Sequence, residues 1–534
     1  MTEAPPGAPW PGLDLRSECH YGGRVFSCHA DRPRNLLAML DETVARHAAD
    51  EALVAGARRL SYGELDRLAR NVAGNLAARG IAPGERVALL LGNGVAFVVY
   101  ALACLRIGAV TVPLGARLKA PELDHAINDC AAAALVYEGE YAGSLPPPAA
   151  LPTLRLRVLV DGTAPGAEPG SAFLEPAPCP SHAAQEEDTA FILYTSGTTG
   201  RPKGALLTHL GIIHSAMNFA LCLGLGPGER AILAVPASHV TGLVAVLFAM
   251  LRCGGCTIMM RAFQARDFLA LAAAERLTYT IMVPAQYALC LMQPDLAGFD
   301  LAAWRIGAFG GAPMQEATIA ALARTWPDLV LVNGYGATET TSPAALMPPG
   351  LNTAHPDSVG QIVPGGAVRV VDEAGTDVAP GEAGEIWIKG AMVVPGYWRR
   401  PTADAAEFTD GYWHSGDIGS LDAAGFLRVF DRKKDMINRA GYKVYSAEVE
   451  NVLAHHPGII EAAIVGVPDP VLGERVKAFV ARRDPGLTAD AVRRFCAARL
   501  ADYKVPEIVV LVDAELPRNA NGKLQKALLR RMSG

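Results

Sequence analysis

Short apolar runs alternate with helical patterns from about residue 35 to about residue 430, and this alternation constrains the fold more than any other feature. The segments NLLAMLDETVARHAAD and SYGELDRLARNVAGNLAARG repeat apolar residues at helical spacing, and Ser61 and Glu64 are spaced as a capping box. The expected buried strands are RVALLL, AALVY, FILYT, AILAV, YTIMV and VLVNGYG. Strands that alternate with helices favour α/β structure, in layers with largely parallel sheets.

Three stretches depart from this rhythm. Residues 1–34 are rich in proline and glycine, which predicts an arm on the surface. Residues 366–430 contain the hairpin patterns VVDEAGTDV and SLDAAGFLRV, which predict a small antiparallel β unit. The residues after Asp431 have helix and strand patterns of their own, so a separate small α+β domain is expected there.

Charge and composition limit the partners. The 48 basic and 54 acidic residues give a net charge of -6, and neither sign forms a long block, so no nucleic-acid or anionic-membrane surface is expected. The start MTEAPPGAPWPGLDL lacks the pattern of a secretory signal, and the longest apolar run, Val95–Leu105, is about half of a membrane span. We therefore expect a cytoplasmic protein whose partners are small molecules.

Ten cysteines are sparse for this length, and only Cys253 and Cys256 are spaced as a pair. No second cysteine or histidine pair stands at ligand spacing. A Gly-Gly turn between a helix and the strand CTIMM is expected there, not a metal or redox site.

The stretch YTSGTTGRPKGA, residues 194–205, follows an apolar strand and has the composition of a phosphate-binding loop. Glycines allow the backbone to approach a ligand closely, and successive N–H groups with Thr and Ser hydroxyls can bind an anion. It is not the P-loop of nucleotide kinases, because Lys203 follows Pro202 and precedes Gly204 where that motif requires a hydroxyl.

This motif resembles the phosphate loop of the adenylate-forming superfamily, which includes acyl-CoA synthetases, aryl-CoA ligases, adenylation domains and luciferases. The family's other motifs follow in its order, from about residue 35 to the end of the chain: GGAPM (310–314), NGYGATETT (333–341), GYWHSGDIG (411–419), DRKKDMINRAGYKVYSAEVE (431–450) and PRNANGKLQK (517–526). The resemblance implies an AMP-forming acyl-CoA ligase that uses ATP, Mg²⁺ and coenzyme A. It further implies an N-terminal AMP-binding domain over residues 35–433 and a mobile lid over 434–534, as a monomer or homodimer.

The resemblance also implies roles in the first half-reaction, in which a carboxylate attacks the α-phosphorus of ATP. Thr338 would donate to the α-phosphate, and Glu339 with Thr195 would hold Mg²⁺. Lys523 matches the lysine that bridges the substrate carboxylate and the α-phosphate. The β- and γ-phosphates would be held by Thr195, Ser196, Gly197, Thr198, Thr199, Gly200 and Lys203.

The nucleoside has its own set of implied contacts. Asp417 and Arg432 stand at the positions of the family's ribose-binding pair. The adenine would lie against Tyr335, with Asn333 on its polar edge, and against the backbone of Gly310, Gly311, Ala312, Gly334 and Gly336.

In the second half-reaction the C-terminal domain of such enzymes swings about a hinge to admit the thiol. Lys434 stands at the hinge position, and Gly441, Tyr442 and Lys443 would line the coenzyme A entrance. Some relatives have Gly or Lys where this chain has Ala440, which leaves the individual contacts open.

The acid is the least defined substrate. His239 in VPASHVTGL could gate the pocket or polarise the carboxylate, although a lone histidine is as often a satisfied core residue. The segments IMVPAQYAL and GAFGGAPM are apolar, with no obvious arginine for a second carboxylate, which favours an aliphatic or aromatic monocarboxylic acid.

Three alternatives remain. A carrier-protein-loading adenylation enzyme is one, although ASHVTG lacks the aspartate of amino-acid activators and the chain ends eleven residues after Lys523. A luciferase-like oxygenase shares the same motifs. A catalytically inactive nucleotide sensor would be expected to lack Lys523, Glu339 or Asp417, and all three are present.

Overall fold

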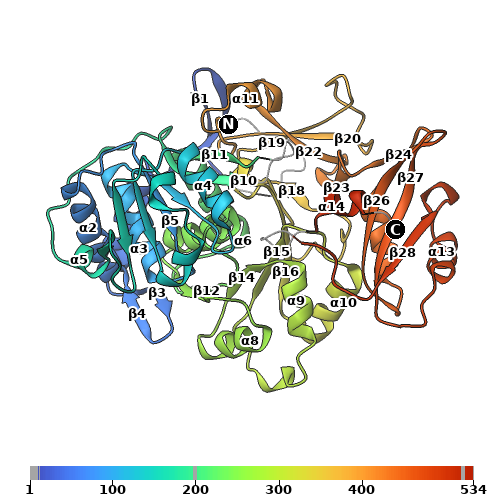
Figure 1. Ribbon diagram of the computed structural model, residues 1–534, viewed down its shortest axis with the longest axis horizontal. Coiled ribbons are helices and arrows are strands. Elements are labelled where there is room, and N and C mark those ends of the chain that lie inside the picture. Colours follow the sequence, from blue (N-terminus) through green and yellow to red (C-terminus); the bar gives the residue numbers. More distant parts are fainter. Residues whose placement is uncertain (1–9, 11–12, 196–200, 519–523, 533–534) are drawn as a thin grey trace. The chain divides into compact units, whose positions relative to one another are not determined.

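The computed structural model describes residue 10 and residues 13–195, 201–518 and 524–532 (Figure 1). It has the mixed α/β architecture that the sequence predicts. The chain forms two compact units, which we describe separately. Unit 1 comprises Met1–Met314, Thr318–Val368 and Ile388–Trp413, and unit 2 comprises Gln315–Ala317, Arg369–Trp387 and His414–Gly534. The expected domain limit between residues 433 and 434, with its hinge, stays a prediction.

The first sheet of unit 1 is parallel except for one strand pair. Its order is β11-β10-β6-β5-β7-β8-β9, and only β10 and β11 are antiparallel. The strands are β5 (Arg86–Leu90), β6 (Val110–Pro113), β7 (Ala134–Tyr137), β8 (Leu156–Leu159), β9 (Glu168–Pro169), β10 (Thr189–Thr195) and β11 (Lys203–Thr208). The helices α3 (Val95–Ile107) and α4 (Ala120–Asp129) connect successive strands, as expected of βαβ units.

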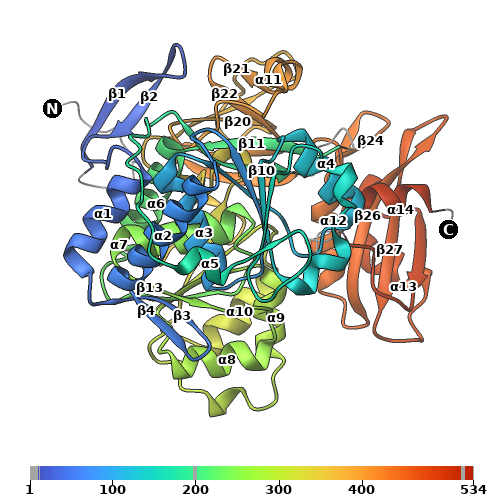
Figure 2. The same ribbon diagram turned by 60° about the vertical axis from the view of Figure 1, so that its left-hand side comes forward.

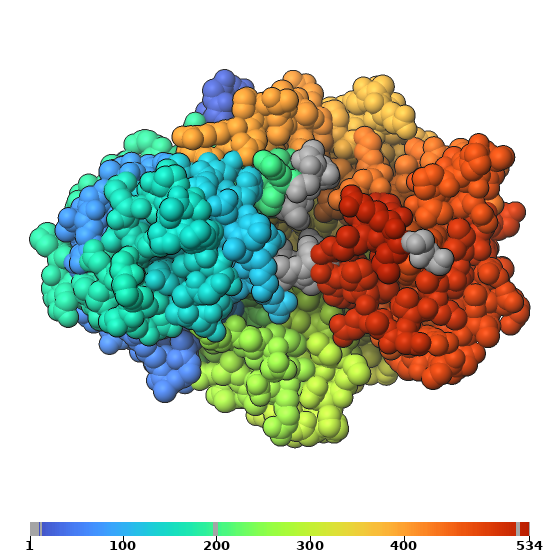
Figure 3. Space-filling model, viewed as in Figure 1, coloured from blue at the N-terminus to red at the C-terminus, as the bar shows by residue number. Residues whose placement is uncertain are grey.

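The second sheet of unit 1 has the order β18-β17-β16-β15-β14-β12-β13-β3-β4, with a parallel centre from β16 to β3. Its strands are β3 (Glu51–Ala55), β4 (Arg58–Ser61), β12 (Arg230–Leu233), β13 (Cys256–Met259), β14 (Tyr279–Met282), β15 (Ile306–Gly310), β16 (Val330–Tyr335), β17 (Ala345–Leu346) and β18 (Gly360–Ile362). In the space-filling view the residues of the first sheet and its helices are mainly blue to teal, and residues 265–325, which follow β13, are green to yellow-green (Figure 3).

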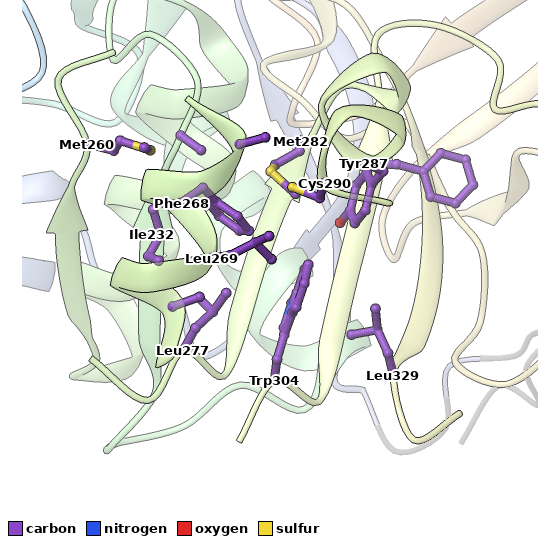
Figure 4. Close-up of a cluster of buried hydrophobic side chains, with 14 of the residues drawn as sticks. Ile232, Met260, Phe268, Leu269, Leu277, Met282, Tyr287, Cys290, Trp304 and Leu329 are labelled. Atoms are coloured by element: carbon purple, nitrogen blue, oxygen red, sulfur yellow. The ribbon is translucent and has the colours of Figure 1, made fainter. Parts of the chain in front are cut away.

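A core between the second sheet and its helices fixes the layers. The helices are α8 (Ala265–Ala274), α9 (Pro284–Leu291) and α10 (Glu316–Thr325). Phe268 of α8 and Tyr287 of α9 pack with Trp304, which precedes β15 (Figure 4). The Tyr287 hydroxyl donates to the carbonyl of Ala308 at 2.8 Å, so even the polar atom of this buried ring is satisfied.

The helices α1 (Leu36–His47) and α2 (Tyr62–Ala78) begin at side-chain caps. Ser61 Oγ accepts from the Glu64 N–H at 3.2 Å, and Glu64 Oε2 accepts from the Ser61 N–H at 2.9 Å, which confirms the predicted capping box. Asn35 Oδ1 accepts from the N–H of Ala38 at 2.8 Å. Helix α2 packs along α3 (Figure 2).

Within residues 1–34, where the sequence predicts only an arm, the chain forms a hairpin of β1 (Leu15–His20) and β2 (Arg24–His29). Phe26 and Cys28 are buried against Leu210. Arg32 binds both Glu18 and Glu186, which ties the hairpin to the residues before β10.

Helix α6 (His209–Leu223) connects β11 of the first sheet to β12 of the second, and the π-helix η3 (Thr241–Phe248) and α7 (Ala249–Cys253) then connect β12 to β13. Gly254 then adopts a left-handed conformation with φ +75°, and β13 begins at Cys256. The Cys253 to Cys256 segment is therefore a turn between a helix and a strand, as predicted.

Among the described residues, no helix combines the length and the apolar character that crossing a membrane requires.

Unit 2 contains two small sheets. The first joins β20 (Gly384–Lys389) to a long hairpin, and the second has the order β25-β24-β27-β26 with β28 parallel to β27. Its main helices are α12 (Ser446–Ala454), α13 (Ala489–Ala497) and α14 (Lys526–Arg531). The strands are β19 (Ala367–Val371), β22 (Tyr412–Leu421), β23 (Phe426–Arg432), β24 (Ile437–Arg439), β25 (Tyr442–Val444), β26 (Ile459–Asp469), β27 (Gly473–Arg482) and β28 (Ile508–Val512).

Candidate active site

The predicted phosphate loop connects the antiparallel strands β10 and β11. Thr195 and Lys203 are opposite each other in the register, so they fix the two ends of the loop at one rung of the ladder. A Cβ atom on Gly204 would lie 2.6 Å from Ile192, which explains the glycine after Lys203. Ser196, Gly197, Thr198, Thr199 and Gly200 lie outside the described residues.

The segment 395–398 supports this hairpin from the side of β11. The Trp398 N–H donates to the Gly204 carbonyl at 2.7 Å, and the Leu206 N–H donates to the Gly396 carbonyl at 3.2 Å. On the other side, Tyr194 donates its hydroxyl to Asp129 Oδ2 at 2.8 Å. The strand ends that flank the loop are therefore held by backbone and side-chain bonds.

Thr195 and Glu339, the two predicted magnesium ligands, lie together. Thr195 Oγ1 donates to Glu339 Oε1 at 3.3 Å, and the Glu339 carbonyl accepts from the Val394 N–H at 2.9 Å. Glu339 is only 8% exposed, and burial raises its pKa. A carboxylate and a hydroxyl are the hard oxygen donors that Mg²⁺ prefers, so the chemistry of this pair fits the ion.

Two residues that sequence reasoning missed complete this cluster. The Tyr397 hydroxyl lies 3.0 Å from Glu339 Oε1 and 2.7 Å from Glu407 Oε2, and Glu407 forms an ion pair with Lys203. Burial and the two neighbouring carboxylates raise the pKa of Tyr397, so its hydroxyl stays protonated. Neither residue stands in a motif that the sequence analysis used, and only the fold brings them to the loop.

The predicted adenine site is built on the carboxyl ends of two adjacent parallel strands. Gly310 of β15 is opposite Gly334 of β16, and a Cβ atom on Gly310 would lie 2.5 Å from the Gly334 carbonyl oxygen. Gly311 has φ +78°, and it is exposed together with Ala312 and Gly336. The glycines therefore keep backbone accessible at this edge of the sheet.

Three further residues of the predicted nucleotide site lie at or just after the end of β16. Asn333 and Tyr335 end β16, and both are half-buried. Asn333 Nδ2 donates to the Ser358 carbonyl at 3.2 Å. Thr338, also half-buried, precedes Glu339 in a short 3₁₀ turn, η5 (Thr338–Thr340).

His239 is half-exposed and lies just before the π-helix η3, where its carbonyl accepts from the Leu243 N–H at 2.8 Å. The segment before it is held by Asn93, which the sequence analysis did not select. Asn93 Nδ2 donates to the Leu233, Val235 and Met260 carbonyls at 3.2, 2.9 and 2.9 Å, and its Oδ1 accepts from the Ala237 N–H at 2.8 Å. Because Asn93 follows β5, one amide connects the two sheets of unit 1.

In unit 2 the predicted ribose pair is assembled across the β22–β23 hairpin. Asp417 and Arg432 are register partners, and Arg432 Nε lies 2.8 Å from Asp417 Oδ1. The Asp417 carboxylate is nearly buried, whereas Arg432 is exposed. Ser415 fixes the backbone of Asp417, because its hydroxyl accepts from the Asp417 N–H at 3.0 Å and donates to the Ile386 carbonyl at 2.7 Å.

The predicted hinge and coenzyme A residues are all exposed. Lys434 lies between the two sheets of unit 2 in sequence, and Gly441 makes the β24–β25 turn with φ +90°. Tyr442 is 57% exposed and stacks on Tyr503 with ring centroids 4.6 Å apart, whereas Lys443 lies opposite Asn438.

Lys523 lies outside the described residues. The chain on either side of it is anchored, because Arg518 and Leu524 form an antiparallel bridge. Lys526 forms an ion pair with Glu450 at 2.7 Å and donates to Ser446 Oγ at 2.5 Å.

The sequence of the chain matches two family models. Residues 40–398 match "AMP-binding enzyme", and residues 448–523 match "AMP-binding enzyme C-terminal domain". The chain belongs to the AMP-binding enzyme family.

Members of the family with known names resemble the chain over most of its length. It is 39% identical to a feruloyl-CoA synthase of Amycolatopsis over 486 residues, which are 90% of this chain and 95% of that protein. It is 34% identical to a long-chain-fatty-acid-CoA ligase of Mycobacterium tuberculosis over 477 residues, 88% of this chain and 93% of that protein.

A solved structure gives the same result. The o-succinylbenzoate coenzyme A synthetase of Bacillus subtilis, in complex with ATP and magnesium ion, has a TM-score of 0.82 and 28% identity and covers 91% of this chain and 98% of its own. The same enzyme is known in complex with its acyl-adenylate intermediate. The expected AMP-binding family and fold are thus confirmed.

Proposed function

We propose that this enzyme activates an aliphatic or aromatic monocarboxylic acid with ATP and transfers the acyl group to coenzyme A. The class of enzyme follows from the family, whose relatives here are CoA synthetases and ligases, so the chain is an AMP-forming acid-thiol ligase. The observation that carries the proposal is the cluster of Thr195, Lys203 and Glu339 at the end of the phosphate-loop hairpin. The carrier-loading alternative has no observation in its favour.

In the first half-reaction the acid carboxylate attacks the α-phosphorus of ATP and pyrophosphate leaves. Two anions must approach, so the site has to neutralise charge. Lys203 and the loop 195–200 would hold the departing β- and γ-phosphates, and Thr338 would donate to the α-phosphate. Magnesium bound at Glu339 and Thr195 would supply further charge neutralisation. Lys523 would bridge the carboxylate and the α-phosphate while the new bond forms.

Asp417 and Arg432 would bind the ribose. Arg432 pairs with the buried Asp417 carboxylate, and a carboxylate is the acceptor that the hydroxyl donors of a ribose require. Asn333, Tyr335 and the glycines at the ends of β15 and β16 would hold the adenine. The exposed backbone at Gly311 and Gly336 suits a flat ring that lies close to the chain.

In the second half-reaction the thiol of coenzyme A attacks the acyl carbon of the acyl-AMP and AMP leaves. We assign the thiol's entry to the β24–β25 turn, with Gly441, Tyr442 and Lys443, and the rearrangement that admits it to a hinge at Lys434. The exposure of all four residues supports this assignment.

The wall of the acid site would be the segment 234–248 together with residues 281–289. Residues 242–248 of η3 are apolar and buried, as are Ile281 and Met282 of β14, and this favours an acid whose remainder is apolar. The two relatives compared above by sequence are named for the feruloyl group and for long-chain fatty acids, and the corresponding acids are monocarboxylic. His239 would lie at the carboxylate end of the acid.

The decisive experiment measures pyrophosphate release and thioester formation over a panel of acids, with and without coenzyme A. The panel contains ferulate, benzoate, octanoate and palmitate, with malonate as the dicarboxylate control. We expect pyrophosphate release with at least one monocarboxylate and a thioester only when coenzyme A is present. Pyrophosphate release without any thioester would favour a carrier-protein acceptor, and a preference for malonate would overturn the assigned substrate class.

A further inference from the structure

The ammonium group of Lys203 is engaged by other side chains of the protein. Its Nζ pairs with Glu407 Oε1, and it lies 4.1 Å from the centroid of the Tyr397 ring. The Lys203 side chain is 9% exposed and that of Glu407 28% exposed. A pair that is mostly shielded from water interacts more strongly than a surface ion pair.

Glu407 is held in place by a second contact. Its Oε2 lies 2.7 Å from the Tyr397 hydroxyl, so each carboxylate oxygen has a partner of its own. Glu407 is the last residue of helix α11 (Pro401–Glu407). Earlier in the helix, Asp404 Oδ1 accepts from the Tyr397 N–H at 2.8 Å, which connects α11 to the segment beside the phosphate hairpin.

The two carboxylates of this cluster have the same sign of charge as the phosphates that the site is proposed to bind. Glu407 and Glu339 both lie within hydrogen-bonding distance of Tyr397, and the cation Lys203 pairs with Glu407. A polyphosphate that binds Lys203 must compete with the Glu407 carboxylate for the ammonium, and it also meets the repulsion of that carboxylate.

We infer that Glu407 is a positioning residue that acts as the resident counter-ion of Lys203 and is displaced from it by the β- and γ-phosphates of the nucleotide. The inference rests on the proposed role of Lys203 in binding those phosphates. Glu407 keeps the lysine at the end of the hairpin and lowers the affinity for ATP and for pyrophosphate. When pyrophosphate leaves, the carboxylate takes back the ammonium, which favours release of this product.

The test uses Glu407→Gln in the full-length enzyme, because glutamine keeps the shape and the acceptor for Tyr397 but removes the charge. Dissociation constants for ATP, pyrophosphate and AMP are measured by calorimetry in the presence of Mg²⁺. We expect the constants for ATP and pyrophosphate to fall about three- to tenfold, the range of a partly shielded ion pair. The constant for AMP, which lacks both phosphates, is expected to stay within about twofold.

Two further variants separate the possible causes. Asp404→Asn removes a negative charge from the same helix, at a carboxylate that accepts from the Tyr397 N–H, and it is expected to change ATP affinity much less than Glu407→Gln does. In a Lys203→Met background, Glu407→Gln is expected to tighten ATP binding less than it does in the wild type, because only the repulsion and not the competition for the ammonium is then removed. The melting temperature of each variant shows whether it is folded.

Unchanged or weaker ATP binding by folded Glu407→Gln would overturn the inference. An equal gain in affinity for AMP would also overturn the inference, because the lost negative charge would then act on any anionic ligand and not through Lys203. Failure of the proposed function has a different signature: Lys203→Met alone would leave ATP affinity as in the wild type.

Discussion

Thr195 Oγ1 lies 3.3 Å from Glu339 Oε1, although 144 positions separate the two residues in the chain. Thr195 ends β10 of the first sheet of unit 1, and Glu339 follows β16 of the second sheet. The proposed magnesium site is therefore a product of how the two sheets pack within unit 1, and it forms only when both are folded.

Glu339→Gln is expected to slow the adenylation half-reaction by about 10² or more, because a neutral amide is a poor ligand for Mg²⁺ and one charge stabiliser is lost. The half-saturating Mg²⁺ concentration should rise in the same variant. Pyrophosphate release at a series of Mg²⁺ concentrations measures both effects. The control is Glu373→Gln, which changes an exposed turn residue. A wild-type dependence on Mg²⁺ in Glu339→Gln would contradict the assignment of Glu339 as a magnesium ligand.

Asp417→Asn is expected to raise the dissociation constants of both ATP and AMP about tenfold, because the ribose is common to the two nucleotides. Hydrogen bonds to a charged group contribute about 1.5–3 kcal/mol. Calorimetric titration with AMP is the simplest measurement. Asp422→Asn is a matched control, because Asp422 is also paired to an arginine in the same hairpin, with Arg428 Nη1 at 2.8 Å. If both variants lost AMP affinity equally, the effect would come from the hairpin's stability.

Lys523→Ala is expected to slow adenylation by about 10² or more while thioester formation from preformed acyl-AMP stays close to wild type. The lysine's charge is needed where two anions meet, and the second half-reaction has no such step. Rapid-quench measurement of each half-reaction separates them. Equal losses in both halves would contradict the assigned role.

The stability of the fold is expected to depend on pH through His209. Its Nδ1 accepts from the N–H of Leu36 at the start of α1 at 3.2 Å, and burial lowers its pKa from 6.5 to about 4. The unfolded chain therefore binds a proton below about pH 6.5 that the native state does not bind. The free energy of unfolding should fall between pH 6.5 and pH 4, by up to about 3 kcal/mol for this group.

Urea unfolding at several pH values, with wild type and His209→Asn compared, isolates this contribution from that of the other buried histidines. Asparagine can still accept from the Leu36 N–H but does not titrate. The difference between the two curves should be flat above pH 6.5 and grow as the pH is lowered. A difference that does not change with pH would show that His209 is not the group responsible.

The layered α/β fold could be predicted from the sequence because strand and helix patterns are local. Alternation and helical periodicity occur within a single segment, as in the strand VLVNGYG and the Ser61 to Glu64 capping box. The β1–β2 hairpin had such a pattern too, since Phe26 and Cys28 are buried and Val25 and Ser27 are exposed. The surrounding prolines and glycines concealed this alternation.

The ion pair between Lys203 and Glu407 had no local pattern at all. Glu407 lies at the end of a short, largely polar helix, and its sequence gives no reason to place it near the phosphate loop. The contact arises because residues 396–398 pair with β11, and that pairing depends on the tertiary structure. Motif spacing can thus identify the residues of the loop but not the groups that hold them before the nucleotide binds.

The hydrogen bonds of Asn93 affect any attempt to change which acid the enzyme accepts. Its amide joins the end of β5, in the sheet that carries the phosphate loop, to the carbonyls that begin the proposed acid wall. A substitution that moves residues 234–239 to admit a larger acid therefore also displaces Asn93 and the end of β5 in the first sheet. Redesigned acid specificity and nucleotide affinity are not independent variables in this enzyme, and variants selected for a new acid should be screened at more than one ATP concentration.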